Sequence, residues 1–419
     1  MLDIIALLIT LTALFSYLNR RFIKLPTTIG VMVLAMLLSL ILMSLGELGY
    51  APIEQRAEAI IASIDFNQVL MESMLSLLLF AGALHVDLEE LARKKWPIGV
   101  LATAGVVAST FLIGIASWIV LNLLSGISIS LLYCLLFGAL ISPTDPIAVL
   151  GILKSAGAPK SLEIKIAGES LFNDGIAVVV FTILLSLALG GADVTTGGIL
   201  LLFAEEALGG IAFGLVIGYI AYRLLRSIDS YDVEILITLA LVLGGYALAI
   251  HLHVSGPIAM VVAGLMIGNH GRRLAMSQTT REHLDTFWEM IDEILNAVLF
   301  VLIGLEVVIL TFDRSHLLAS LSIVPLVLLA RLVCVGIPVT VMRRWFGFEF
   351  TPHAIKIMTW GGLRGGISVA LALSLPAGPE RHIVLALTYI VVLFSILVQG
   401  LTIGPLIRKT AAPIEQPGA

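Results

Sequence analysis

Charged residues are scarce in this chain. Asp, Glu, Lys and Arg make up 13% of its 419 residues, whereas a soluble domain carries about 25%. Apolar residues take their place, at 59% of the chain with a mean hydropathy of +1.07. This composition excludes an ordinary soluble protein and indicates a chain that crosses a membrane many times.

Cysteine is also nearly absent, and so are the motifs of nucleotide-driven or metal-dependent catalysis. The two cysteines, Cys134 and Cys334, lie inside apolar runs with neither zinc-site nor disulfide spacing, so we interpret both as packing residues. The chain has no GxxxxGK[ST] phosphate loop and no HExxH motif. We therefore predict that the protein is not an enzyme, needs no cofactor and takes its energy from an ion gradient.

Long apolar runs are what the chain has in abundance, and they predict thirteen transmembrane helices in an all-α membrane protein. The first run lacks the basic flank and cleavage site of a signal peptide, so we expect it to be retained. The predicted spans are residues 2 to 18, 27 to 45, 67 to 85, 97 to 122, 128 to 150, 164 to 189, 199 to 222, 233 to 250, 255 to 270, 284 to 311, 316 to 341, 353 to 376 and 382 to 406.

Lysines and arginines outside the spans gather on one predicted side of the membrane, and only Arg56, Arg314 and Arg381 fall on the other side. Because positive residues concentrate in cytoplasmic loops, the N-terminus is predicted outside and the C-terminus in the cytoplasm. An odd span count with opposite termini fits two inverted six-helix repeats, helices 1 to 6 and 8 to 13, joined by helix 7.

Three carboxylates lie at apparent membrane depth between residues 141 and 175: Asp145, Glu169 and Asp174. A charge in hydrocarbon costs roughly 2.5 to 3.5 kcal/mol on insertion scales, so such residues face a cavity or a partner. Asp145 lies between Pro143 and Pro146, and each proline removes a helical N–H and crowds the preceding turn. The helix is therefore predicted to break here, leaving Asp145 beside unwound backbone that can line a wet cavity.

The other two acids share one predicted helix. Ser170 and Asp174 are four residues apart and fall on one stripe, while Glu169 and Asn173 fall on the next. The first stripe supplies hard oxygen ligands. The second offers a carboxylate and an amide to a cationic partner, and Arg331 in a later apolar run is the candidate.

The segments TDPIAVL at 144–150 and GESLFNDG at 168–175 resemble the NhaP-type sodium/proton antiporters, relatives of the eukaryotic NHE exchangers. Further matching segments, LLFAGALHVDLEEL, SGPIAMVVAGLMIGN, FVLIGLE and GGLRGGISVALALSLP, extend the resemblance over nearly the whole chain. The resemblance implies the NhaA/NhaP-like antiporter fold, in which two broken helices cross. SPTDP and GGLRGG are the matching interruptions, in helices 5 and 12.

The same resemblance implies a homodimer in the cell inner membrane that serves pH homeostasis, with transport helices separate from scaffold helices. The expected division is scaffold and dimerisation helices 1 to 3 at 1–96, core transport helices 4 to 6 at 97–190, linker helix 7 with scaffold helices 8 to 10 at 191–311, core helices 11 to 13 at 312–409, and a short cytoplasmic tail at 410–419.

A buried carboxylate can be neutralised by H⁺ or by Na⁺ but not by both at once, so alternating access of one site couples their opposite movements. Sodium prefers oxygen ligands, by analogy with calcium and magnesium. Asp174, Ser170, Asp145 and the Thr144 carbonyl supply that set, and the resemblance supports the same residues. An Asn–Asp pair, here Asn173 and Asp174, resembles electroneutral exchangers.

We interpret Glu169 and Arg331 as a structural ion pair between helices 6 and 11, and we expect Asn173 to bridge this pair to the ion site. Arg364 in GLRGG is expected to compensate the partial negative charge where a half-helix ends. The remaining acids near the spans are expected to line the external or cytoplasmic funnels or to lie at helix ends: Glu72, Glu205, Glu206, Asp292, Glu293 and Glu306.

Two alternatives stay open at this point. Exchange of K⁺ or Li⁺ for H⁺ uses the same scaffold, since the ligand types fix hardness but not cavity size. A cation channel is the alternative from another class, and it lacks support because no TVGYG-like filter occurs.

Overall fold

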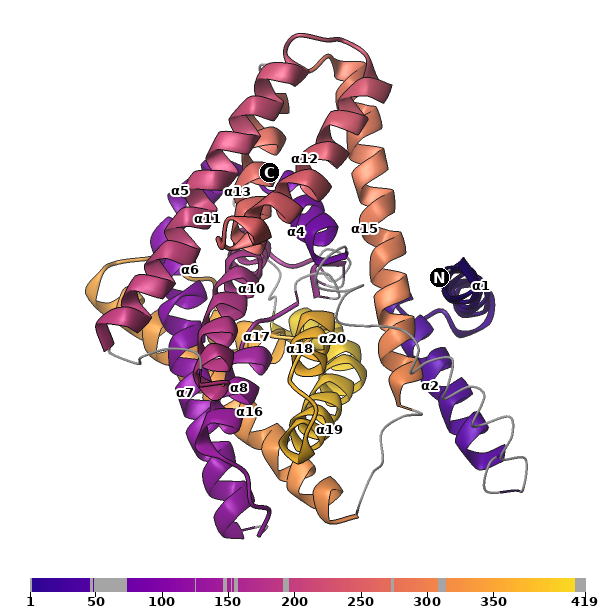
Figure 1. Cartoon of the computed structure of the whole chain (residues 1–419), viewed down its shortest axis with the longest axis vertical. Helices are drawn as coiled ribbons and strands as arrows, with labels where there is room; N and C mark the ends of the chain where they lie inside the picture. The colour runs from indigo at the N-terminus through magenta and orange to yellow at the C-terminus, as the bar shows by residue number, and fades with distance from the viewer. Residues whose placement is uncertain are drawn as a thin grey trace, which may run out of the picture.

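The structure is a computed structural model that describes residues 2–45, 48, 74–124, 126–145, 149–151, 153, 157–190, 196–272, 275–307 and 314–410. All regular elements in these residues are helices (Figure 1). Eight of the described helical stretches are long and apolar enough to cross a membrane, and two shorter apolar helices, α4 and α8, accompany them.

The helices follow the predicted apolar runs, several of them with a π-helical turn (η) at one end. Their bounds are α1 Leu2–Leu18, η1 Asn19–Ile23, α2 Thr27–Leu45, α4 Leu75–Leu84, α5 Leu88–Arg93, α6 Lys95–Ala102, α7 Ala104–Ile119, η4 Val120–Leu124, α8 Leu131–Ile141, α10 Lys160–Ala188, α11 Thr196–Leu225, α12 Tyr231–His251, α13 Gly256–Met266, η5 Ile267–Gly271, α15 Gln278–Glu306, α16 Arg314–Trp345, α17 Ala354–Trp360, α18 Gly366–Leu373, α19 Pro379–Phe394, η6 Ser395–Gln399 and α20 Gly400–Thr410.

Two differences from the predicted spans have clear physical reasons. The stretch predicted as one span from residue 97 is interrupted at Thr103, whose hydroxyl donates to the Gly99 carbonyl at 2.6 Å, a side-chain bond that competes with the helical ladder. Helix α15 begins at Gln278, before the predicted start at 284, because Ser277 caps it and its first turns are polar. Hydropathy alone does not detect such a polar extension.

Both predicted interruptions are present. Helix α8 ends at Ile141 ahead of the proline-flanked acid, and α17 and α18 are separated by residues 361–365. The other predicted interruption-free spans that lie within the described residues are helical, while part of the span 67–85 and Glu72 lie outside them. Within the residues that the structure describes, both predicted interruptions are therefore helix breaks, and they lie far apart in the sequence.

The helices pack closely through small residues. A Cβ at Gly214 of α11 would lie 2.6 Å from the Ala259 carbonyl oxygen of α13, and one at Gly210 would lie 2.7 Å from the Ser255 carbonyl oxygen. These glycines form a packing face between α11 and α13. In lipid, where helices gain little from hiding apolar surface from each other, such close backbone contact provides the attraction.

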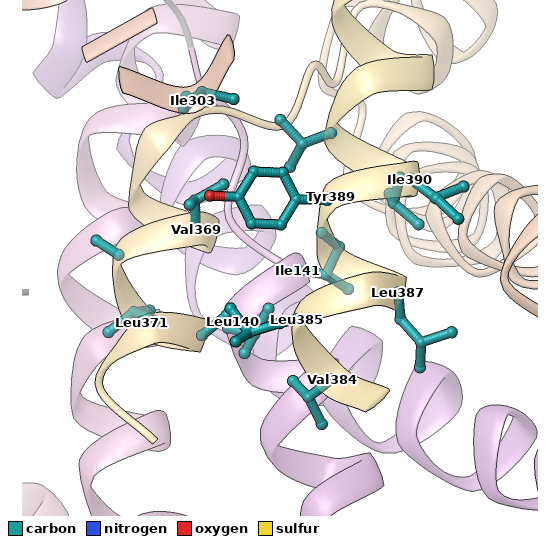
Figure 2. Packing of buried hydrophobic residues seen from close by; sticks show 14 of the residues in the cluster. Leu140, Ile141, Ile303, Val369, Leu371, Val384, Leu385, Leu387, Tyr389 and Ile390 are labelled. Atoms are coloured by element: carbon teal, nitrogen blue, oxygen red, sulfur yellow. The ribbon is translucent and has the colours of Figure 1, made fainter. Parts of the chain in front are cut away.

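An apolar cluster surrounds the break-bearing helices. Tyr389 of α19 is fully buried, and its ring points from α19 toward Val369 of α18, with Ile303 of α15 nearby and Leu140 and Ile141 of α8 beneath it (Figure 2). Four helices thus share one packed interior next to the two breaks. This packing fixes where the unwound segments lie.

Candidate functional site

The two helix breaks bond directly to each other. The Asp145 backbone N–H donates to the Leu363 carbonyl at 2.8 Å. In the other direction, the buried Arg364 guanidinium donates to the carbonyls of Ser142 at 2.5 Å and Pro143 at 2.7 Å. The Ser142 carbonyl lost its helical donor at Pro146, which has no N–H, and Arg364 replaces that donor, so each break satisfies backbone groups that the other leaves exposed.

The backbone of Arg364 is fixed by a contact with a third segment. Its backbone N–H donates at 2.8 Å to the hydroxyl of Ser395, which opens the π-helical turn η6. Such turns are frequent at functional sites because they displace the local backbone. The side chain expected to compensate the end of a half-helix therefore lies at the carboxyl end of α8.

Glycines allow the breaks to approach. A Cβ at Gly365, the N-cap of α18, would collide with the Asp145 carboxylate. A Cβ at Gly362 would lie 2.8 Å from Arg331 Nε and 3.2 Å from Thr144 Cγ2. The Asp145 carboxylate consequently packs against the amino end of a helix, where the helix dipole favours negative charge.

Gly365→Ala is expected to displace the Asp145 carboxylate and to reduce the rate of ion exchange at least tenfold. Moving a reacting group by about 1 Å can lower a rate as much as a hundredfold. Exchange rates in proteoliposomes check this. Gly378→Ala is the matched control, because a Cβ there meets no atom within 4 Å. Wild-type rates for Gly365→Ala would contradict the tight contact.

Helix α10 places its polar stripe against the first break. The hydroxyls of Thr144 and Ser170 are 2.9 Å apart, and Asn173 Nδ2 donates to Thr144 Oγ1 at 3.0 Å. The Thr144 backbone N–H completes the set with a long bond of 3.4 Å to Asn173 Oδ1. Asn173 was expected to bridge the ion pair to the ion site; these hydrogen bonds join it to Thr144 on the site side, and its link to the ion pair stays a prediction.

A cavity of about 70 Å³ lies where the breaks meet α10, and both carboxylates, Asp145 and Asp174, line it. A single water needs only about 10 to 15 Å³ by the same measure, so the cavity has room for an ion with some of its hydration shell. Asp174 is buried and Asp145 is partly buried. Thr144 and Ser170, the other two predicted ligands, are not among the residues that line this cavity, and their hydroxyls bond to each other.

The rest of the described cavity wall is mainly apolar, with a few exceptions. It consists of Leu75, Leu78, Leu79, Gly82, Pro143, Leu171, Leu299, Gly365, Gly366 and Ile367, and of the polar side chains Asn296 and Ser368. Two carboxylates in so small and apolar a space repel each other unless a proton or a cation neutralises them. The arrangement can therefore hold one positive charge.

The structure brings Glu169 and Arg331 together. Arg331 Nη1 lies 2.5 Å from Glu169 Oε1, and both residues are buried. Arg331 Nη2 also donates to the Met358 carbonyl of α17 at 3.4 Å. The pair therefore joins α10 and α16 and extends to the second broken segment through Met358 of α17.

The remaining predicted acids are scattered. Glu205 and Glu293 are exposed, Glu206 and Asp292 are partly buried, and Glu306 is buried at the end of α15. The sequence interpretation passed over Asn296, which lines the cavity. Its signal was an amide within the apolar run LNAVLFVLIG, four residues after Asp292, where helical periodicity puts both on one face.

Comparison with known proteins places these features in a family context. The family model described as "Sodium/hydrogen exchanger, transmembrane" matches residues 8–409. The chain is 58% identical over 420 residues to the Na⁺/H⁺ antiporter NhaP of Pseudomonas aeruginosa, with 99% of each chain covered. It is 38% identical to the Na⁺/H⁺ antiporter NhaH of Halobacillus dabanensis, covering 85% of this chain and 87% of that protein.

The fold has a solved counterpart. The sodium proton antiporter MjNhaP1 of Methanocaldococcus jannaschii, solved at pH 8, superposes with a TM-score of 0.75 and covers 97% of both chains at 20% sequence identity. At that identity the likeness concerns the fold alone.

Proposed function

The chain belongs to the sodium/hydrogen exchanger family, and we propose that it is a secondary active antiporter that exchanges Na⁺ for H⁺ across the membrane. The observation that carries the proposal is the small cavity at the contact of the two helix breaks, lined by the carboxylates of Asp145 and Asp174. The full-length similarity to the Pseudomonas aeruginosa antiporter supports the choice of ions.

Exchange follows from competition for one charge. Asp174 binds either a proton or Na⁺, with Asp145, the Ser170 hydroxyl and the Thr144 carbonyl as further oxygen ligands and water completing the shell. An empty site leaves carboxylates unneutralised at membrane depth, which is costly. The site therefore changes the side of the membrane to which it is open only when an ion is bound. It crosses in one direction with Na⁺ bound and in the other direction with H⁺ bound.

The stoichiometry follows from the charge that the site can hold. Asn173 is neutral and donates to Thr144, so Asp174 is the one carboxylate of the Asn–Asp pair that changes its load. Glu169 is paired with Arg331, and in the proposed cycle this pair stays intact and carries no exchanged charge. We propose that one Na⁺ exchanges for one H⁺ and that transport is electroneutral.

The architecture expected from the sequence completes the proposal. Thirteen crossings form two inverted six-helix halves, with the N-terminus outside and the C-terminus in the cytoplasm of an inner-membrane homodimer. In support, α8, α10, α16 and α19 pack around the breaks, whereas α2 packs on α15 and α13 packs on α4 and α11. The first group is proposed to move as the transport core against the second, which serves as the scaffold.

The function is tested by reconstitution into liposomes with an imposed pH gradient. Addition of Na⁺ should dissipate the gradient, and the initial rate should be unaffected when valinomycin and K⁺ clamp the membrane potential. The apparent KM for Na⁺ should rise about tenfold for each unit of falling pH once the protonated site predominates, because each bound proton must leave first.

Three outcomes would overturn parts of the proposal. If the initial exchange rate depends strongly on the clamped membrane potential, transport is not electroneutral. If K⁺ or Li⁺ dissipates the pH gradient and Na⁺ does not, the transported cation is K⁺ or Li⁺ and the antiport mechanism stands. Sodium flux without proton countermovement would indicate a channel.

A further inference from the structure

Asn296 is a polar side chain in the cavity that none of the roles above uses. It lies on α15, is 2% exposed, and lines the same cavity as Asp145 and Asp174. Its Oδ1 is buried and has no hydrogen-bond partner among the described residues. An unpaired buried acceptor destabilises a fold by about 1 to 3 kcal/mol. An acceptor in this position therefore points to a ligand that pairs with it.

The orientation of the amide is fixed by chemistry. Its nitrogen lies 2.7 Å from the Asp292 backbone carbonyl and 3.1 Å from Asp292 Oδ1. Both atoms are acceptors, so the group facing them must be the NH₂, and the carbonyl oxygen is left for the cavity side. Asp292 therefore acts as a positioning residue for Asn296.

We propose that Asn296 Oδ1 is an additional ligand of the transported cation, supplied by α15 from outside the two broken helices and oriented by Asp292. This inference rests on the proposed function of the cavity. An amide oxygen is a hard donor of the kind that alkali and alkaline-earth cations take. A neutral oxygen adds coordination without adding charge, so the one-for-one exchange is unchanged.

The ligand has a consequence for the transport cycle. Helix α15 packs on α2, α1, α4 and α12 as well as on α18, so it belongs with the proposed scaffold. When the core moves relative to the scaffold, Asn296 loses contact with the ion while Asp174 keeps it. Cation affinity should therefore differ between the two faces of the membrane, and Asn296 contributes to that difference.

The test measures Na⁺-driven proton movement in proteoliposomes that contain the full chain. Asn296→Leu keeps the approximate size of the side chain but removes the oxygen, and it is expected to raise the apparent KM for Na⁺ about tenfold, the effect of losing one strong contact to a charge. Its maximal rate and its melting temperature without Na⁺ should stay close to wild type. Asn296→Gln, which keeps a neutral amide oxygen one methylene further out, should raise the KM less than Asn296→Leu does.

The positioning role has its own pair of variants. Asp292→Asn should raise the KM by a smaller factor, about threefold, since the backbone carbonyl still holds the amide. Glu289→Gln removes a charge from an exposed position on the same helix and should leave the KM unchanged. Equal effects of Asp292→Asn and Glu289→Gln would mean that Asp292 acts only through its negative charge and does not position Asn296.

Failure of this inference is distinguishable from failure of the proposed function. If wild-type protein exchanges Na⁺ for H⁺ and Asn296→Leu keeps the wild-type KM, Asn296 is not a ligand and the antiporter assignment stands. If the maximal rate and the melting temperature fall while the KM stays constant, Asn296 is a packing residue. If wild type itself moves no protons with Na⁺, the function of the whole cavity is wrong.

Discussion

Asp174→Asn should reduce Na⁺-dependent proton movement to the level of protein-free liposomes while the protein remains folded. An amide is close to a carboxylate in size, so the packing of α10 is kept, but an amide neither binds a proton at physiological pH nor neutralises a cation. Asp174 is buried, lines the cavity and has Asp145 as its charged neighbour there. Removal of this charge removes the group that both ions share.

Two checks of folding and two further variants sharpen that result. Circular dichroism and size-exclusion chromatography of Asp174→Asn should match wild type. Asp174→Glu, which keeps the charge and shifts it by one methylene, should retain partial activity, and Asp145→Asn should weaken the apparent Na⁺ affinity or abolish transport. Continued exchange by Asp174→Asn would mean that the carrier is another group, and the shared-site mechanism would have to be abandoned.

Arg331→Ala is the second change with a large expected effect, here on stability. It leaves Glu169 buried without its charge partner, and breaking a buried pair from one side costs about 3 to 5 kcal/mol. The Met358 carbonyl also loses a donor. The apparent melting temperature in detergent should therefore fall steeply, and activity should fall with it.

A double-mutant cycle tests whether Glu169 and Arg331 are energetically coupled. The charge-swapped protein carrying Glu169→Arg and Arg331→Glu should recover part of the lost stability, because the two charges are again opposite across the same 2.5 Å contact. The recovery will be incomplete, since the exchanged side chains differ in length and the bond to Met358 is not rebuilt. Additive losses in the cycle would argue that the pair is not coupled.

Sequence reasoning placed the breaks well because proline and glycine act locally. Two prolines around Asp145 remove helical donors wherever they occur, and GGLRGG is a poor helix in any surroundings. The contact of Glu169 with Arg331 was also foreseen, since a buried charge needs a partner and few cationic side chains lie within the apolar runs. These inferences needed no tertiary information.

Other features required the folded arrangement. Asn173 was expected to bridge the ion pair to the ion site, but its hydrogen bonds to Thr144 could not be predicted from the sequence, because the direction of a side chain depends on how α10 rotates against the break. Asn296 was passed over since α15 carries no break and its residues reach the cavity only through packing. Sequence periodicity defines a helix face but does not say which neighbour that face meets.

The reciprocal bonds between the breaks have a consequence for biogenesis. Arg364 supplies the donors for the carbonyl of Ser142, 222 positions earlier in the chain. At roughly 5 to 20 residues synthesised per second, the first break is made about 10 to 45 s before its partner leaves the ribosome. During that interval its polar backbone needs water or an insertion chaperone, and nascent chains stalled before residue 361 should remain the preferred targets of membrane quality-control proteases.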